Sequence, residues 1–202
     1  MVDLGRLLVF EGPDGVGKST LANAVYAHLT SMGAACELHS FPGDKEGSLG
    51  RLVYRLHHAP NSHGVISIDA TSLQVLHVAA HIDLIKSSIV PALKTGKDVV
   101  LDRFWWSTWV YGKVSGVDSR SLEEMRLLEL ANWGDILPKC LFLIHRSSPI
   151  NRKESLDRWN RLSVEYRLLA KEEEKKYTIS FIENEGCLSE AVEEVLGLIL
   201  GR

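Results

Sequence analysis

The stretch FEGPDGVGKST, residues 10–20, gathers residue types that can bind phosphate groups. Three glycines, one lysine and two hydroxyl side chains follow directly after a short apolar run. Gly12, Gly17, Lys18 and Ser19 fit the pattern G-x-x-x-x-G-K-S/T at every fixed position. Glycines let several backbone N–H groups turn toward one point, and a helix that begins there adds its positive dipole end. The stretch therefore predicts a binding site for a nucleoside triphosphate.

Within this loop, we expect Lys18 to reach the β- and γ-phosphates of ATP and the Ser19 hydroxyl to bind Mg²⁺. Asp14 is an unusual charge here, because its carboxylate would repel the phosphates unless it points away from them. Two interpretations stay open: Asp14 faces a second ligand, or it is a solvated loop carboxylate. The residues expected to bind ATP are Gly12, Pro13, Asp14, Gly15, Val16, Gly17, Lys18, Ser19 and Thr20.

A second charged pair, Asp102 and Arg103, closes the apolar run DVVLD at residues 98–102. The carboxyl end of a buried parallel strand is where ligands bind in open α/β sheets. A carboxylate at this edge can hold the water shell of Mg²⁺, and a guanidinium can clamp a phosphate with two hydrogen bonds. The alternative is a structural ion pair. We expect Asp102 to share the metal with Ser19 and Arg103 to clamp a phosphate group.

The elements that must position these residues follow from the hydrophobic pattern. Short apolar runs alternate with longer helical patterns, which indicates βαβ units, a parallel sheet and an α/β fold. Pro91 is expected to bend or break the longest helix, and the stretch before that helix reads as loop-rich. Strands are expected at residues 7–10, 36–41, 98–102, 140–145 and 179–182, and helices at 17–32, 71–93 and 189–200.

The composition is that of an ordinary soluble globular protein, and we expect residues 1–202 to form one domain. Of the 202 residues, 45% are hydrophobic and 24% charged, and the net charge of −3 speaks against a general nucleic-acid-binding surface. The aromatic cluster in residues 104–111 lacks interleaved basic residues, which favours core or dimer packing. Three widely spaced cysteines without a CxxC pair favour a reducing compartment. We expect a cytoplasmic protein with no membrane-spanning stretch and no nucleic-acid partner.

Taken together, the motifs resemble the thymidylate kinase family of P-loop nucleoside monophosphate kinases. The phosphate-binding stretch is similar to the family's EGxDGxGKST, and DRFWWSTWVYG at residues 102–112 is similar to its DRY..S..AYQ. Three further segments are supportive: FPGDKEGSLG at 41–50, LPKCLFLI at 137–144 and YRLLA at 166–170. The resemblance spans nearly the full chain.

The resemblance implies a three-layer P-loop fold with a five-stranded parallel sheet, helices on both faces and a short lid at about residues 145–158. It implies ATP- and Mg²⁺-dependent phosphoryl transfer to a nucleoside monophosphate, most simply dTMP to dTDP, in a homodimer. Asp14 matches the aspartate that contacts the acceptor sugar, which favours a ligand-facing role for it. The residues implied in acceptor binding are Asp14, Phe41, Lys45, His77, His81, Arg103 and Tyr111.

Phosphoryl transfer also needs positive charge on the transferring group and exclusion of water. The lid segment supplies Arg146, Arg152, Lys153 and Arg158, and we expect Arg152 first, then Arg158, to act in catalysis together with Lys18, Asp14 and Arg103. For any single lid residue, a solvent-exposed basic loop is an alternative interpretation.

The chain departs from the family on the acceptor side. Lys45 replaces the arginine of the acceptor loop, as a point charge without the two-pronged guanidinium. His77 and His81 stand where the family has Phe and Arg one turn apart, so a nucleobase pocket is expected but thymine preference is in question. His57, His58 and His63 are expected to be solvated. Two alternatives follow: a kinase for another nucleotide or nucleoside, and a nucleotide-binding regulatory module without transfer activity.

Overall fold

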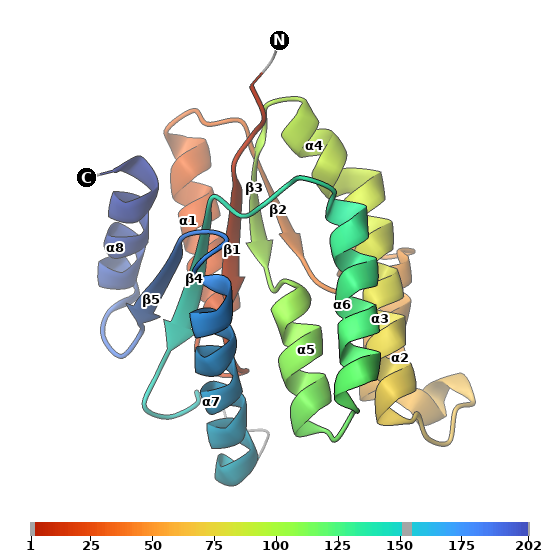
Figure 1. Ribbon diagram of the computed structural model, residues 1–202. Coiled ribbons are helices and arrows are strands. Elements are labelled where there is room, and N and C mark those ends of the chain that lie inside the picture. Colours follow the sequence, from red (N-terminus) through yellow and green to blue (C-terminus); the bar gives the residue numbers. More distant parts are fainter. Residues whose placement is uncertain (1–2, 151–154, 202) are drawn as a thin grey trace.

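The computed structural model describes residues 3–150 and 155–201. At its centre lies a five-stranded sheet in the order β2-β3-β1-β4-β5, with every neighbouring pair parallel (Figure 1). This confirms the predicted parallel α/β fold and the predicted strands to within one residue at each end. The strands are β1 (Leu7–Glu11), β2 (Cys36–Ser40), β3 (Asp98–Asp102), β4 (Cys140–His145) and β5 (Ile179–Glu183).

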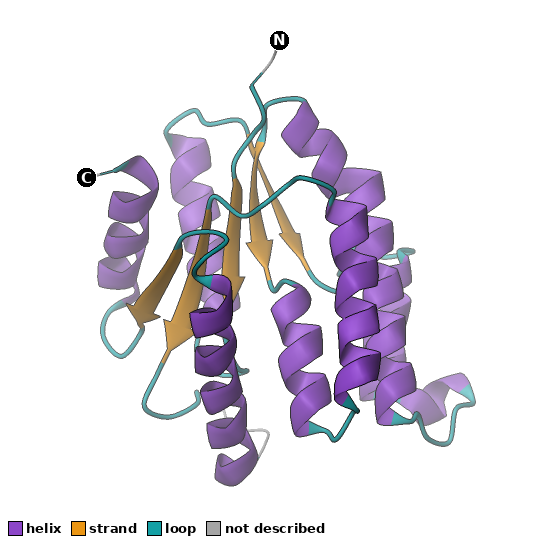
Figure 2. Ribbon diagram, in the orientation of Figure 1, coloured by secondary structure: helices purple, strands orange, loops and turns teal. Residues whose placement is uncertain are grey.

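Helices cover both faces of this sheet (Figure 2). Because side chains alternate along a strand, β1 sends Leu8 and Phe10 to one face and Leu7 and Val9 to the other. On the first face pack α1 (Lys18–Ser31) and α8 (Leu188–Leu200), and on the second pack the other long helices. These are α3 (Ala70–Leu84), α5 (Trp105–Val114), α6 (Ser119–Trp133) and α7 (Leu156–Glu173).

The stretch before α3, which we expected to be loop-rich, contains the helix α2 (Leu49–His58) and a short 3₁₀ turn, η1 (Pro60–His63). The expectation was therefore wrong over residues 49–58. The helix begins at Ser48, whose side-chain oxygen accepts a hydrogen bond from Arg51 N (3.1 Å). Only Gly50 and Val53 of this helix are buried. The sequence nevertheless carries a helical signal that the loop-rich expectation overlooked, because Leu49, Leu52, Val53 and Leu56 recur at helical spacing.

The long helix expected at 71–93 exists but deviates earlier than Pro91. It runs as α3, then a π-helical turn η2 (Ile85–Ile89), then α4 (Val90–Lys94). Proline lacks an N–H group and its ring crowds the carbonyl four residues before it, so the turn preceding Pro91 is the one that widens.

The same run, Ala70–Lys94, is long and apolar enough to cross a membrane by length and composition alone. The expectation that no stretch reaches this length was therefore wrong. Here Ile85, Ile89 and Leu93 are fully buried in the core on the second face of the sheet. The buried core helix of a soluble protein satisfies the same criterion.

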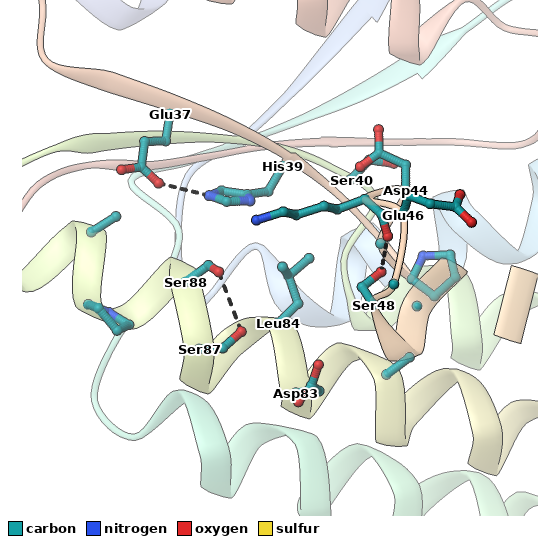
Figure 3. A pocket seen from close by; sticks show the side chains of 18 of the residues that line it. Glu37, His39, Ser40, Asp44, Glu46, Ser48, Asp83, Leu84, Ser87 and Ser88 are labelled. Carbon is teal, nitrogen blue, oxygen red and sulfur yellow. Dashed lines mark hydrogen bonds and ion pairs between the residues drawn. The ribbon is translucent and has the colours of Figure 1, made fainter. Parts of the chain in front are cut away.

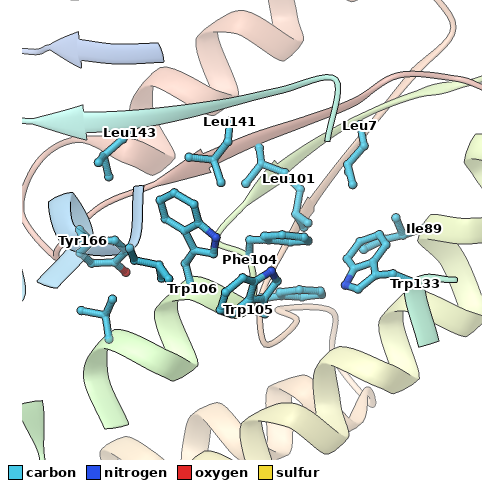
Figure 4. Close-up of a cluster of buried hydrophobic side chains, with 14 of the residues drawn as sticks. Leu7, Ile89, Leu101, Phe104, Trp105, Trp106, Trp133, Leu141, Leu143 and Tyr166 are labelled. Atoms are coloured by element: carbon cyan, nitrogen blue, oxygen red, sulfur yellow. The ribbon is translucent and has the colours of Figure 1, made fainter. Parts of the chain in front are cut away.

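The aromatic cluster predicted in residues 104–111 lies mainly in the core. Phe104, Trp105 and Trp106 are at most 2% exposed and pack with Trp133 and Tyr166 beneath the sheet (Figure 4). Trp109 is half-buried at the margin of this cluster. Core packing is thus confirmed for three of the aromatic residues at the start of α5, the helix that follows the Asp102-Arg103 pair.

Candidate active site

The phosphate-binding loop connects β1 to α1, as the motif predicts. Gly12 has φ 138°, and a Cβ there would lie 2.6 Å from the Ile144 carbonyl oxygen of the neighbouring strand. Gly17 has φ 89°, and a Cβ there would lie 2.4 Å from Asn184 Nδ2. Both positions therefore require glycine, because a side chain meets both an unfavourable backbone conformation and neighbouring atoms.

Two side chains from distant elements hold the loop in place. Asn184, directly after β5, donates from Nδ2 to the Val16 carbonyl (2.7 Å). Trp159 of α7 donates from Nε1 to the Asp14 carbonyl (2.8 Å). The loop is thus shaped by the far edge of the sheet and by the helix after the lid segment.

Lys18, the lysine of the motif, lies buried within the loop. Its Nζ donates to the Pro13 carbonyl (2.9 Å) and lies 3.6 Å from Asp14 Oδ1. Burial lowers the pKa of the Lys18 ammonium, and the positive charge of Arg103 lowers it further, while nearby carboxylates oppose this effect. The positive charges of Lys18 and Arg103 repel each other, so the arrangement favours binding of an anion between them.

Asp14 and Arg103 meet across the sheet edge. The Arg103 guanidinium donates to the Asp14 carboxylate and lies 5.6 Å from the centre of the Tyr111 ring. The Tyr111 hydroxyl in turn accepts a hydrogen bond from Asp14 N (3.0 Å). Burial raises the pKa of Asp14, but Arg103 and Lys18 outweigh this and hold the pKa well below its usual range. Asp14 is therefore ionised and paired with Arg103, although its side chain is 56% exposed.

Arg103 stands in the left-handed region of backbone conformation, with φ 75°, and is the one non-glycine residue with positive φ in the described part of the chain. Such a backbone costs on the order of 1 kcal/mol or more and persists only where the surroundings hold it. Its N–H donates to the Phe10 carbonyl (2.9 Å), and its guanidinium donates to Ser107 Oγ (3.1 Å). The turn directs Arg103 back over the phosphate-binding loop, because β3 lies next to β1.

Ser19 and Asp102 form the predicted metal pair. The Ser19 hydroxyl donates to Asp102 Oδ2, while Asp102 Oδ1 is buried without a hydrogen-bond partner. A hydroxyl beside a carboxylate with a free buried oxygen is a donor set that fits Mg²⁺ and its water shell. Within residues 3–150 and 155–201 there is no cluster of three or more His, Cys, Asp or Glu that could hold a metal ion.

On the acceptor side, the predicted residues Phe41 and His81 pack against each other inside the protein. Their rings stack with centroids 3.9 Å apart and an angle of 9° between the planes. His81 is 2% exposed, and its Nδ1 lies 2.9 Å from Oε2 of Glu129 in α6, which is fully buried. The Nδ1 atom of His81 is therefore engaged by Glu129, and one face of the His81 ring is covered by Phe41.

His77, the other predicted base contact, pairs with His57 instead. The distance from His77 Nε2 to His57 Nδ1 is 3.2 Å. Burial lowers the pKa of His77 to about 2, with the charges of His81, His57 and Arg103 acting in the same direction. His57 belongs to α2 and is exposed, as expected, although its ring contacts His77. Partial burial and the charges of His58 and Arg103 lower its pKa.

Lys45 lies apart from the residues above. It is exposed and lines a cavity of about 850 Å³ between β2, the start of α2 and the α3–α4 run (Figure 3). Glu37, His39, Asp83, Ser87 and Ser88 share this cavity, and residues 12–20 do not line it. The structure therefore does not bring Lys45 to the phosphate-binding loop.

The lid residues are only partly placed. Arg152, our first choice for a catalytic lid arginine, and Lys153 lie outside the described residues. Arg158 begins α7 and donates from Nη2 to Ser115 Oγ (3.0 Å), just beyond the C-terminal end of α5. Arg146 donates to the Asn184 carbonyl and lies 3.6 Å from Glu185. The roles of the lid arginines stay predictions.

Sequence reasoning missed Glu11, the last residue of β1. Its side chain is fully buried and accepts hydrogen bonds from Phe104 N (2.7 Å) and Ser107 N (3.0 Å). A signal was present, because a carboxylate at the end of a buried apolar strand must find partners. The sequence could not show that the partners lie about 90 residues away.

A glycine-rich phosphate loop between a strand and a helix, faced by an arginine and a carboxylate from the adjacent strand, defines a P-loop phosphotransferase. The model of the thymidylate kinase family matches residues 10–185. This chain is 32% identical over 161 residues to a thymidylate kinase of Dehalococcoides mccartyi (strain CBDB1), covering 75% of this chain and 74% of that protein. The chain belongs to the thymidylate kinase family.

Two further comparisons agree with this. A thymidylate kinase of Legionella pneumophila (strain Corby) is 30% identical over 179 residues, covering 83% of this chain and 82% of that protein. The crystal structure of thymidylate kinase from Ehrlichia chaffeensis superposes with a TM-score of 0.79 at 20% identity, covering 96% of this chain and 98% of that one. At this level of identity, the structural match shows that the fold is shared.

Proposed function

We propose that this chain transfers the γ-phosphoryl group of ATP to dTMP, giving dTDP and ADP. Membership of the thymidylate kinase family supports the reaction. The observation that carries the proposal for this chain is the convergence of Lys18, Asp14 and Arg103 at the mouth of the phosphate-binding loop. One cation belongs to the donor loop and the other to the neighbouring strand, as transfer between two phosphorylated ligands requires.

For the donor, the backbone N–H groups of residues 12–20 other than Pro13 would surround the phosphates, and the Lys18 ammonium would neutralise charge on the transferring group. The residues that would hold Mg²⁺ are Ser19 and Asp102. When bound, the ion would supply positive charge that stabilises the negative charge of the transferring phosphoryl group. Asp102 stays fixed by β3 and by the Ser19 hydroxyl, so its unpartnered oxygen is held at the sheet edge.

For the acceptor, Arg103 exchanges its contact with the Asp14 carboxylate for the phosphate of the monophosphate, and Asp14 turns to the sugar. The Tyr111 ring borders the same space. Phe41, His77 and His81 stay our proposed base-side residues, and the influence of the Arg103 charge on the pKa of His77 supports this for His77. Lys45, expected as a charge of the acceptor loop, lies on a separate cavity and is not kept among them. No covalent enzyme intermediate is needed, because orientation and fixed positive charge lower the barrier.

We further propose that residues 145–158 close over the bound phosphates, with Arg152 or Arg158 spreading the charge of the transition state. For Arg158 this requires release of its hydrogen bond to Ser115. Closure would exclude water and so suppress hydrolysis of ATP. In this proposal, residues 1–202 form one domain, and the lid is a part of it.

The test is an acceptor panel. Purified protein is incubated with ATP, Mg²⁺ and one of several nucleoside monophosphates or thymidine, and acceptor-dependent ADP release is measured. We expect dTMP to give the highest kcat/KM, and Lys18→Met to abolish turnover with every acceptor. Equal turnover with dTMP, dUMP and dCMP would refute the thymidylate assignment. Tight ATP binding without turnover for any acceptor would establish a regulatory module instead.

A specific observation favours a second candidate, a kinase with a different preferred monophosphate. His81 stands where the family's base-reading arginine is found, yet it pairs with buried Glu129 and stacks on Phe41. A ring held in this way presents fewer donors to a base than a guanidinium does. The same acceptor panel separates the two candidates.

We also propose a cytoplasmic homodimer that binds neither nucleic acid nor membrane. The three cysteines are unpaired, which suits a reducing compartment. Val75 of α3 and Leu127 and Leu128 of α6 are each at least 50% exposed, on helices that contact one another. Light scattering should give twice the 22.5 kDa of one chain, and Leu128→Glu should give a single chain. A monomeric wild type would refute this proposal.

A further inference from the structure

We propose that Glu11 is a positioning residue for the reaction, which holds Arg103 in its working place through Ser107. The inference rests on the proposed role of Arg103 in binding the acceptor phosphate. Glu11 itself lies behind the phosphate-binding loop, and its side chain is fully buried.

The first step is that Glu11 caps helix α5 from another strand. Helix α5 begins after Phe104, which makes no side-chain cap. Glu11 Oε1 accepts from Phe104 N (2.7 Å) and Ser107 N (3.0 Å) in place of a local cap. The N–H of the third helical residue, here Ser107, is one that a capping side chain normally satisfies. The direction in which α5 leaves the sheet edge therefore depends on Glu11.

The second step is the contact between Glu11 and Ser107 side chains. Glu11 Oε2 accepts from Ser107 Oγ (3.0 Å), from the Tyr166 hydroxyl (3.1 Å) and from Gly12 N (3.2 Å). Five donors thus surround one carboxylate, from the loop, the start of α5 and helix α7. This number of donors suits an ionised carboxylate that has lost all contact with water.

The third step is that the same Ser107 hydroxyl accepts a hydrogen bond from Arg103 Nη1 (3.1 Å). Arg103 has a positive φ and precedes α5 directly, so its side chain is steered both by the turn and by the helix start. Glu11 fixes the start of α5 through the two backbone N–H groups and fixes the Ser107 oxygen through one hydrogen bond. A shift of the helix start or of the Ser107 oxygen would therefore move the Arg103 guanidinium.

The fourth step is charge. Glu11 is a buried carboxyl whose charged form interacts with both cations of the site. Burial raises the pKa of the Glu11 carboxyl, and the charges of Arg103 and Lys18 offset this only in part, so the five hydrogen-bond donors are what suit its ionised form. A carboxylate behind the loop lets both cations face the phosphates without unbalanced repulsion between them.

The main test variant is Glu11→Gln. The amide oxygen can still accept from Phe104 N and Ser107 N, but the amide nitrogen cannot accept from Ser107 Oγ, Tyr166 or Gly12. Initial rates are measured against dTMP and against ATP. We expect KM for dTMP to rise about tenfold, which is the effect of losing a hydrogen bond to a charged group. The dissociation constant of a non-hydrolysable ATP analogue should change less than threefold.

Two further variants keep this test decisive. Ser107→Ala removes the link to Arg103 but leaves Glu11 in place, and it should show the same selective rise in KM for dTMP. Glu173→Gln is the matched control: Glu173 ends α7, is 6% exposed, and accepts hydrogen bonds from Lys176 and Tyr177, which follow α7, rather than from Ser107 or Arg103. If Glu11→Gln does not fold, Ser107→Ala decides the question.

A second readout does not depend on kinase activity. The side-chain Nε–H resonance of Arg103 is followed by NMR in isotope-labelled protein and assigned by its loss in Arg103→Lys. We expect it to shift in Glu11→Gln and Ser107→Ala and to stay unchanged in Glu173→Gln. A wild type without dTMP turnover would refute the proposed function, and this resonance would still decide the role of Glu11.

The proposal is overturned if the Arg103 resonance is unchanged in both test variants. It is also overturned if Glu11→Gln weakens the binding of dTMP and of the ATP analogue to the same extent, because a general loss of structure would have this effect. A selective effect on the acceptor with a shifted Arg103 resonance supports it.

Discussion

At the scale of single residues, the site depends on how one guanidinium is shared. Arg103 contacts Asp14, Ser107 and the face of Tyr111, all on the side of the sheet edge where the phosphate-binding loop lies. In this arrangement the Asp14 carboxylate lies where it competes with an acceptor phosphate for the same guanidinium. Acceptor binding therefore includes an exchange of one anion for another around Arg103.

We predict that Arg103→Lys weakens acceptor use selectively. A lysine keeps the charge but cannot hold a carboxylate or phosphate with two parallel hydrogen bonds. We expect kcat/KM for dTMP to fall about 30-fold, the loss of one charge-assisted hydrogen bond, with ATP affinity within threefold of wild type. Arg126→Lys is the control, because Arg126 pairs with Glu123 on α6. Equal effects of the two substitutions on kcat/KM would contradict the assigned role.

A second prediction at this scale concerns His77 and pH. The pKa of His77 is about 2 in the folded protein, against 6.5 for the free side chain. Between these values the unfolded chain binds a proton that the folded protein does not, so stability falls as pH falls below 6.5. Charged or titratable neighbours are His57 and His58 from α2, His81 from α3, and Arg103.

The measurement is urea unfolding at pH 7.5, 6.0 and 5.0. For the wild type we expect the free energy of unfolding to decrease on acidification by up to about 1 kcal/mol per pH unit more than for His77→Gln. His63→Gln serves as control, because His63 is exposed in η1. Parallel pH profiles for wild type and His77→Gln would show that His77 takes up its proton normally.

At the scale of elements, α7 connects the lid segment to the site. It carries Trp159, which bonds the phosphate-binding loop, and Tyr166, which bonds Glu11. The helix begins at Ser155, whose side-chain oxygen accepts from Arg158 N (3.2 Å). Its start therefore fixes where the lid segment rejoins the body of the protein.

We predict that Ser155→Ala destabilises the protein by about 1 kcal/mol, the usual value for loss of a helix N-cap. Ser163→Ala, on the same helix, should be neutral or slightly stabilising. Ser163 sits within the helix and donates to the Trp159 carbonyl (3.1 Å), where alanine has the better helix propensity. Thermal unfolding followed by circular dichroism measures both, and two equal changes would contradict the cap assignment.

At the scale of the whole molecule, the site is supported by an aromatic core directly beneath it. Trp106, in the first turn of α5, is fully buried and donates from Nε1 to the Tyr177 hydroxyl (2.9 Å). It lies in the same core as Leu101, Leu143 and Tyr166, which come from two strands and α7. The core thus joins the Arg103 turn to the rest of the fold.

We predict that Trp106→Ala lowers the free energy of unfolding by about 3–5 kcal/mol, because it leaves a large cavity and an unpaired hydroxyl. Trp109→Ala should cost less than half as much, since Trp109 is only half-buried. Urea unfolding followed by far-ultraviolet circular dichroism is the measurement. A loss below 1 kcal/mol for Trp106→Ala would contradict the importance of this core.

Much of this protein follows from the sequence alone. Strands β1, β3 and β4 are short, nearly continuous apolar runs, and the phosphate-binding loop is a local motif whose glycines and lysine follow one another in the chain. Asp102 and Arg103 are predictable because they end one of these runs. Each of these features is decided by neighbouring residues, so their order along the chain is sufficient information.

What only the tertiary structure decided are the contacts between residues far apart in the chain. Glu11 caps a helix about 90 residues later, His81 pairs with Glu129, and His77 pairs with His57 across two helices. The tertiary structure alone also places Lys45 on a different cavity from the phosphate-binding loop. Buried polar groups must find partners wherever the packing of strands and helices brings them, and that packing is not written in any local stretch.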